Sequence, residues 1–159
     1  MARPPLGDPA MLVASVGGIG LLPLAPGTWG SLVGVALAWA IPDWRVLLVL
    51  CAVLFAAGWW AAKCVAERSG IADPGFVVID EVVGQALVLA SAPRTLWVCA
   101  VGFVLFRIAD ILKPWPIRRI EARFRNGFGI MIDDVAAAVY AGAALVLILK
   151  FYPEVPHVT

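Results

Sequence analysis

The chain has 159 residues, of which 62% are hydrophobic and only 14% are charged, and its formal net charge is +1. Soluble domains carry about 25% charged residues, so this composition excludes an ordinary soluble protein and indicates an integral membrane protein. So small a net charge indicates no nucleic-acid partner. No linker or charge run divides the chain, so we expect one membrane-embedded domain over residues 1–159, with residues 1–10 and 152–159 peripheral to it.

The first apolar stretch, residues 11–24, is a poor candidate for a membrane span. Three glycines and Pro23 interrupt it, whereas a span needs about 20 consecutive, mainly apolar residues. We expect this stretch to lie at the membrane interface or to re-enter the membrane. A full extra span is the alternative.

Five further apolar segments follow, separated by turn-forming residues. Pro42 and Pro93 mark two of the breaks, and Pro74 with neighbouring glycines marks a third. The pattern predicts an all-α integral membrane bundle with about five transmembrane helices. The expected helical segments are residues 28–41, 44–66, 76–92, 95–112 and 130–151.

Basic residues are divided unevenly between the two membrane faces that this alternation of helices defines. Most fall on the face where the third and fifth segments begin, and such an excess of Lys and Arg is typical of the cytoplasmic side. This face carries Arg3, Lys63, Arg68, Arg107, Lys113, Arg118, Arg119, Arg123 and Arg125, and the other carries Arg45, Arg94 and Lys150.

Five carboxylates from three of the expected helices reach that same cytoplasmic face. Asp80 and Glu81 begin the third segment, Asp110 lies near the end of the fourth, and Asp133 and Asp134 begin the fifth. One such acid is readily explained as a charge in the headgroup region, but five at one depth favour a functional cluster. Carboxylates at a water interface suit Mg²⁺, which prefers oxygen ligands and keeps several waters.

Two classes of function can use this cluster. A transporter or channel can relay protons or bind a cation there, although transporter sites usually lie near the bilayer midplane and not at one face. Phosphoryl chemistry is favoured by Arg107, Asp110 and Lys113, because their spacing of three residues places them near one face of a helix. Cationic donors then lie beside the expected metal ligands.

A second candidate for anion binding is "LAPGTWGS", residues 24–31. Gly27 and Gly30 permit tight turns, and Thr28 or Ser31 can cap the following helix, leaving backbone N–H groups for a phosphate or carboxylate. An ordinary entry turn explains these residues equally well. The stretch does not match the G-x-x-x-x-G-K-[ST] phosphate loop.

Several motifs of known phosphoryl-transfer mechanisms are absent from the sequence, and their absence reduces the number of possible mechanisms. The single histidine, His157, is third from the end and on the expected outer side, which argues against a phosphohistidine. None of the cysteines is followed six residues later by Arg, and the sequence has no D-x-D-x-T motif. Water activated by a metal, or attack by one of the aspartates, remains.

Taken together, four stretches closely resemble the phosphatidylglycerophosphatase A family. They are "LAPGTWGS", "VIDEVVGQ", "FRIADILKPWPIRRIE" and "GFGIMIDDVAAAVYAG", in that order, within residues 22–142. The resemblance implies a small, multi-pass enzyme of the bacterial inner membrane with its active site facing the cytoplasm. It also implies that the enzyme depends on Mg²⁺ and removes the terminal phosphate of phosphatidylglycerophosphate to give phosphatidylglycerol.

The family pattern falls on particular positions of this chain, and we assign roles to them as expectations. Activity on other lipid phosphomonoesters, the number of metal ions and the oligomeric state stay open. Asp80, Glu81, Asp133 and Asp134 are expected to hold one or two Mg²⁺, Asp110 to be a further ligand or a general base, and Gly27, Thr28, Ser31, Arg107 and Lys113 to bind the substrate.

Overall fold

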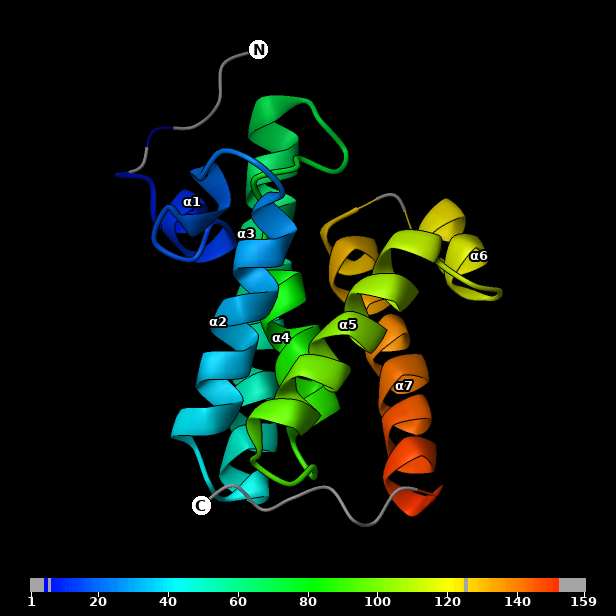
Figure 1. Cartoon of the computed structure of the whole chain (residues 1–159). Coiled ribbons are helices and arrows are strands. Elements are labelled where there is room, and N and C mark those ends of the chain that lie inside the picture. Colours follow the sequence, from blue (N-terminus) through cyan, green and yellow to red (C-terminus); the bar gives the residue numbers. More distant parts are fainter. Residues whose placement is uncertain (1–4, 6, 125, 152–159) are drawn as a thin grey trace.

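The structure is a computed structural model that describes residue 5, residues 7–124 and residues 126–151, without the side chains of residues 120–122. The expected peripheral tail, residues 152–159, and most of the first six residues lie outside this part. Within it all regular structure is helical, which confirms the all-α prediction (Figure 1). The elements are α1 (Pro9–Ala14), the 3-10 helix η1 (Ile19–Leu21), α2 (Pro26–Ala40), α3 (Trp44–Ser69), α4 (Ile79–Leu89), α5 (Leu96–Leu112), α6 (Ile117–Arg123) and α7 (Gly127–Phe151).

Local chemistry explains where the long helices begin and end. Asp43 precedes α3 and accepts a hydrogen bond from the amide of Arg45 at 2.8 Å, and Gly70 ends the helix with a φ of 70°. Thr95 caps α5 by accepting from the amide of Val98 at 3.3 Å. Such caps satisfy amides that have no partner within the helix. The predicted breaks at Pro42 and Pro93 are confirmed.

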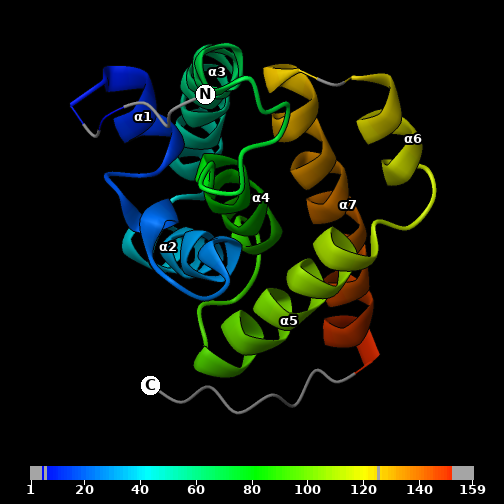
Figure 2. The same ribbon diagram turned by 90° about the horizontal axis from the view of Figure 1, so that it is seen from above.

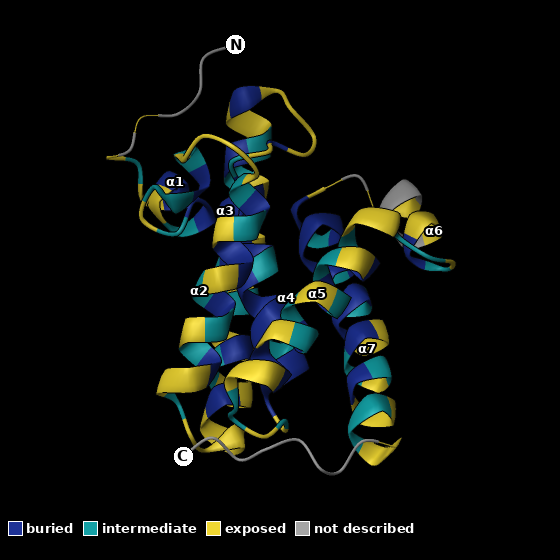
Figure 3. Ribbon diagram, viewed as in Figure 1, coloured by how far each residue is buried: buried dark blue, intermediate teal, exposed yellow. Residues whose placement is uncertain are grey.

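Helix α4 is the centre of the bundle. Seen from above, it is surrounded by α2, α3, α5 and α7, and it contacts all four (Figure 2). Every residue of α4 except Glu81 and Leu87 is buried, as the dark ribbon in Figure 3 shows. The apolar sequence of α4 therefore reflects burial among the other helices, and not contact with lipid.

Glycines on α2 allow it to approach α4 closely. A Cβ atom added at Gly30 would lie 2.8 Å from the carbonyl oxygen of Val78, and one at Gly34 would lie 2.7 Å from that of Val82. Small residues at such spacing let helix backbones pack together in membrane proteins. The start of α4 is thereby held against the start of α2.

The N-terminal segment does not form an extra span. Helix α1 has 6 residues and η1 has 3, and α1 packs against α3. The carbonyl of Ala14 accepts a hydrogen bond from the amide of Val78 at 2.9 Å, just before α4. The segment covers the end of the bundle where α4 begins.

Among the described residues, two helices, α3 with 26 residues and α7 with 25, are long and apolar enough to cross a membrane. Large apolar side chains on them face outward, among them Val49 and Leu147, which points to a membrane protein. Helix α4 has only 11 residues, a rise of about 17 Å against a hydrocarbon core of about 30 Å. The expected count of about five spans is therefore not confirmed.

The directions of the helices bring functional candidates to one end. Helices α2, α4 and α7 begin at the end of the bundle where α3 and α5 finish (Figure 1). Asp80, Glu81, Asp110 and Asp134 accordingly gather there from three helices, as the alternation of segments predicted.

Candidate active site

The first turn of α4 contributes two acids to the interior. Asp80 is 8% exposed, and Glu81 is half-buried. Val78 precedes this turn and makes no side-chain capping bond. The two carboxylates therefore lie beside first-turn amides that no cap satisfies, and these amides give the start of the helix a partial positive charge. The turn is fixed from the α2 side, where an added Cβ at Gly30 would lie 3.3 Å from the Cβ of Glu81.

Gly27 leaves room for two charged groups of opposite sign. A Cβ atom there would overlap the Oε1 atom of Glu81 and would lie 3.0 Å from the Nη1 atom of Arg107. The site therefore requires glycine at this position. Helices α2, α4 and α5 come together at Gly27.

Helix α7 contributes Asp134 to the same place. Asp134 is 4% exposed, and α7 lies close to α4 because Gly84 has no side chain: an added Cβ would lie 3.0 Å from the carbonyl oxygen of Asp134. One carboxylate oxygen from each of Asp80, Glu81 and Asp134 lies within 4.8 Å of the others. We call these three residues the carboxylate cluster.

Within the described part of the chain, the cluster has unsatisfied oxygens. Asp80 Oδ1, Glu81 Oε2 and Asp134 Oδ2 are buried and have no hydrogen-bond partner. Buried charges need a counter-charge or coordination to a cation. Three oxygens in this arrangement are the donor set that a hard divalent cation prefers, so the residues fit a site for Mg²⁺.

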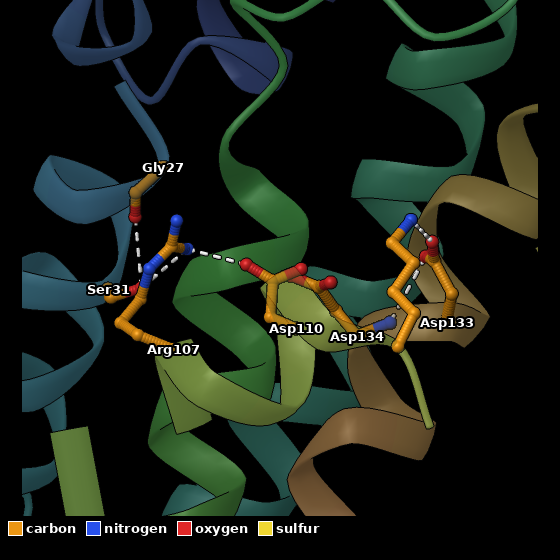
Figure 4. A network of polar contacts seen from close by, with 7 residues as sticks. Gly27, Ser31, Arg107, Asp110, Asp133 and Asp134 are labelled. Carbon is orange, nitrogen blue, oxygen red and sulfur yellow. Dashed lines mark hydrogen bonds and ion pairs between the residues drawn. The ribbon is translucent and has the colours of Figure 1, made fainter. Parts of the chain in front are cut away.

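Arg107 belongs to a short chain of polar contacts (Figure 4). Its Nη1 atom is 2.7 Å from Asp110 Oδ2 and 3.4 Å from Ser31 Oγ. Ser31 in turn donates to the carbonyl of Gly27 at 2.9 Å. Asp110 lies between Arg107 and Asp134 in this view, and the Nη1 atom of Arg107 also borders the Glu81 carboxylate at Gly27.

Lys113 follows the last residue of α5 and pairs with Asp133 of α7. The distance from Lys113 Nζ to Asp133 Oδ2 is 2.7 Å, and Asp133 Oδ1 accepts from the amide of Asp134 at 3.1 Å. Asp133 is buried but is not one of the three clustered acids. The structure therefore brings together three of the four expected metal ligands and directs the fourth to a lysine.

The prediction that Thr28 or Ser31 caps α2 is wrong. The residue before the helix is Ala25, with a φ of 50° and no side-chain capping bond, because Pro26 takes the first helical position that suits proline. The amide of Thr28 donates to the carbonyl of Ala25 at 2.9 Å, and Ser31 is fully buried and bonds back to Gly27. Thr28 is half-buried beside the site.

Comparison with known proteins identifies the family to which the chain belongs. The family model described as Phosphatidylglycerophosphatase A matches residues 12–149. The chain belongs to the phosphatidylglycerophosphatase A family. It is therefore a phosphatase, and the resemblance seen in the sequence is confirmed. Membership of this family does not support the transporter alternative.

Curated relatives support this family membership, and each aligns with the chain over most of its own length. A Haemophilus influenzae protein named Phosphatidylglycerophosphatase A is 43% identical over 138 residues, covering 84% of this chain and 85% of the relative. An Escherichia coli protein of the same name is 36% identical, covering 96% and 90%. A Bacteroides thetaiotaomicron protein, provisionally named a phosphatidylinositol-3-phosphatase, is 40% identical, covering 82% and 87%. No solved structure matches the chain.

One residue of the phosphatidylglycerophosphatase A signature "VIDEVVGQ" received no role from the sequence. Gln85 is completely buried, and neither polar atom of its side chain has a partner among the described residues. The available signal was its spacing of four residues from Glu81, which places both on one face of α4. A single amide in an apolar helix matches no catalytic motif by itself.

Proposed function

We propose that this chain hydrolyses phosphatidylglycerophosphate, with the help of Mg²⁺, to phosphatidylglycerol and inorganic phosphate. The observation that carries the proposal is the carboxylate cluster, which has unsatisfied buried oxygens and two basic side chains nearby. Arg107 borders Glu81 at Gly27, and Lys113 pairs with Asp133, the neighbour of Asp134. The names of the Haemophilus and Escherichia relatives support this substrate.

Asp80, Glu81 and Asp134 are the residues that hold Mg²⁺ in this proposal. An ion held there would supply positive charge to offset the charge that develops on the phosphoryl oxygens. The three acids come from two helices that pack closely at Gly84, so the donor set is preorganised. Asp133 supports this arrangement indirectly, by holding Lys113 and the amide of Asp134.

Arg107 and Lys113 bind the phosphomonoester of the substrate. Both are held by acids, Asp110 and Asp133, at 2.7 Å, so their positive groups are oriented before substrate arrives. The planar guanidinium of Arg107 suits two phosphate oxygens at once. Ser31 and Gly27 fix the guanidinium from the α2 side.

Asp110 is the general base. Its carboxylate lies between Arg107 and Asp134, next to the place where the phosphate meets the cluster. A water oxygen attacks phosphorus, its proton passes to Asp110, and the bond between phosphorus and the glycerol oxygen breaks. Asp110 then passes this proton to the glycerol oxygen, which leaves phosphatidylglycerol and inorganic phosphate and returns Asp110 to its carboxylate form.

The lipid tails reach the site from the side of the bundle. An apolar groove of about 240 Å³ runs between α5 and α7, with Ile108, Leu112 and Ala144 in its walls. Ala109 and Pro114, which also line it, are the neighbours of Asp110 and Lys113. An acyl chain in this groove leaves the headgroup beside the basic residues.

The proposed location is the inner membrane of a bacterium, with the site facing the cytoplasm. The end of the bundle that carries the cluster also carries most of the basic residues, while Arg45, Arg94 and Lys150 belong to the opposite end. The positive-inside rule then orients the molecule.

Phosphate release from phosphatidylglycerophosphate in mixed micelles tests the proposal, using purified protein with Mg²⁺ or with EDTA. Wild-type protein is expected to release phosphate only with the metal. Asp80→Asn and Asp134→Asn should each lose more than about tenfold in kcat/KM, or about 1.4 kcal/mol of transition-state stabilisation. The matched control is Asp43→Asn, because Asp43 is exposed at the other end and Asn also caps helices well. Full activity in both site variants contradicts the carboxylate model.

A further inference from the structure

Gln85 is the most isolated polar side chain in the described interior. It is 0% exposed, and neither Nε2 nor Oε1 has a hydrogen-bond partner in the part of the chain that the structure describes. A buried amide without partners is unfavourable, whereas an apolar side chain of the same shape avoids that cost. Packing alone therefore does not account for glutamine at this position.

The position of Gln85 relates it to the carboxylate cluster. It lies one turn after Glu81 on α4, and both side chains begin on the face that meets the α2 glycines: an added Cβ at Gly34 would lie 2.8 Å from the Cβ of Gln85. Long side chains on a helix lean toward its N-terminus. This general direction brings the Gln85 amide toward the turn that carries Glu81.

Glu81 has a matching unsatisfied atom. Its Oε2 is buried without a partner, while Oε1 is directed to the space left by Gly27. Carboxylates that ligate metals are usually held by hydrogen bonds from neighbouring groups, which fix their orientation. Arg107 Nη1 borders the same space on the Oε1 side, but no donor among the described residues reaches Oε2.

We propose that Gln85 is a positioning residue for Glu81, whose carboxylate receives a hydrogen bond from the Gln85 Nε2 atom when the cluster holds a divalent cation. This inference rests on the proposed function, because it assumes that the cluster binds Mg²⁺. Gln85 touches neither the ion nor the phosphate. Its effect is on the affinity for the ion.

The test is a magnesium titration of full-length protein in detergent, followed by the rise in melting temperature and, separately, by phosphate release. The test variant is Gln85→Met, which keeps an unbranched side chain of similar length and removes the donor. Its apparent Kd for Mg²⁺ should rise about ten- to hundredfold. Its melting temperature without metal should equal or exceed that of wild type, because an unpartnered amide has been removed.

The control is Leu89→Ala, at the other end of α4. Leu89 is 4% exposed, so this change removes buried packing and should lower the melting temperature without changing the apparent Kd for Mg²⁺. The two variants thus separate positioning from stability. If Gln85→Met fails to fold, Gln85→Asn keeps an amide, withdraws it from Glu81 by one methylene, and should still weaken Mg²⁺ binding.

Gln85→Met with wild-type affinity for Mg²⁺ would overturn the inference while the phosphatase proposal stands. Wild-type protein that neither responds to Mg²⁺ nor releases phosphate overturns the proposed function itself.

Discussion

Asp133 and Asp134 are neighbours on α7, yet their carboxylates have different partners. Asp133 pairs with Lys113 at 2.7 Å, whereas Asp134 lies with Asp80 and Glu81. Adjacent side chains on a helix project about 100° apart, so one helical turn serves both the cluster and α5. The amide of Asp134 also donates to Asp133, which couples the two residues.

The first prediction separates these two aspartates. Asp134→Asn removes a carboxylate from the cluster and should reduce kcat/KM more than about tenfold, while raising the Mg²⁺ concentration needed for half-maximal rate. Asp133→Asn leaves the cluster intact and loosens Lys113, so it should chiefly raise KM for the lipid. Phosphate release measured across Mg²⁺ and lipid concentrations checks both. Identical metal dependence in the two variants contradicts the division of roles.

The second prediction concerns Arg107. Its guanidinium reaches both Asp110 and Ser31, and a single ammonium group cannot make the same planar set of contacts. Arg107→Lys should therefore lower kcat/KM by more than about tenfold although the charge is kept. Arg45→Lys is the matched control, because Arg45 is exposed at the opposite end. Full activity in Arg107→Lys would show that charge alone is needed.

The third prediction is that a methyl group at Gly27 damages the site. Gly27→Ala places an atom where Glu81 Oε1 lies and crowds the guanidinium of Arg107. Overpacking of this kind typically costs about 1–3 kcal/mol, and activity should fall with the displacement of both charged groups. Phosphate release and the melting temperature are measured together.

Gly142→Ala supplies the control for that change. A Cβ at Gly142, on α7, meets nothing within 4 Å, and alanine is favoured over glycine within a helix by up to about 1 kcal/mol. This variant should keep full activity and should melt at the same or a higher temperature. If Gly27→Ala and Gly142→Ala had the same activity and the same melting temperature, that result would contradict the close packing at Gly27.

The sequence predicted correctly that acids from different helices lie at the same end of the bundle. Consecutive helices run in opposite directions, and this alternation alone decides at which end each helix begins. Asp80, Asp110 and Asp134 were placed at one face on that basis. The individual partners of Asp133 and Asp134 were beyond this reasoning, which left open which of the two faces the metal. Helix rotation depends on tertiary packing at positions such as Gly84.

Helix lengths and caps were predicted less well. Residues 76–92 are apolar like a span, but α4 covers only Ile79–Leu89, because a helix buried among other helices has the same composition as one facing lipid. The cap of α2 was missed because Ala25 adopts a positive φ, which its residue type does not indicate. The first difference arises from tertiary packing, and the second from the local backbone before Pro26.

The last prediction tests the groove between α5 and α7 as the path for an acyl chain. Ile108→Trp and Ala144→Trp fill it from opposite walls, and each should lower kcat/KM several-fold for the long-chain lipid. The deacylated headgroup, glycerophosphoglycerol phosphate, needs no groove and should be hydrolysed at the wild-type rate. Val146→Trp is the control, because Val146 is 61% exposed and lies two residues from Ala144, on another face of α7. Equal losses on both substrates would place the effect in the phosphate site and contradict the groove, whereas equal losses in Val146→Trp would indicate a general effect of bulk at the lipid surface.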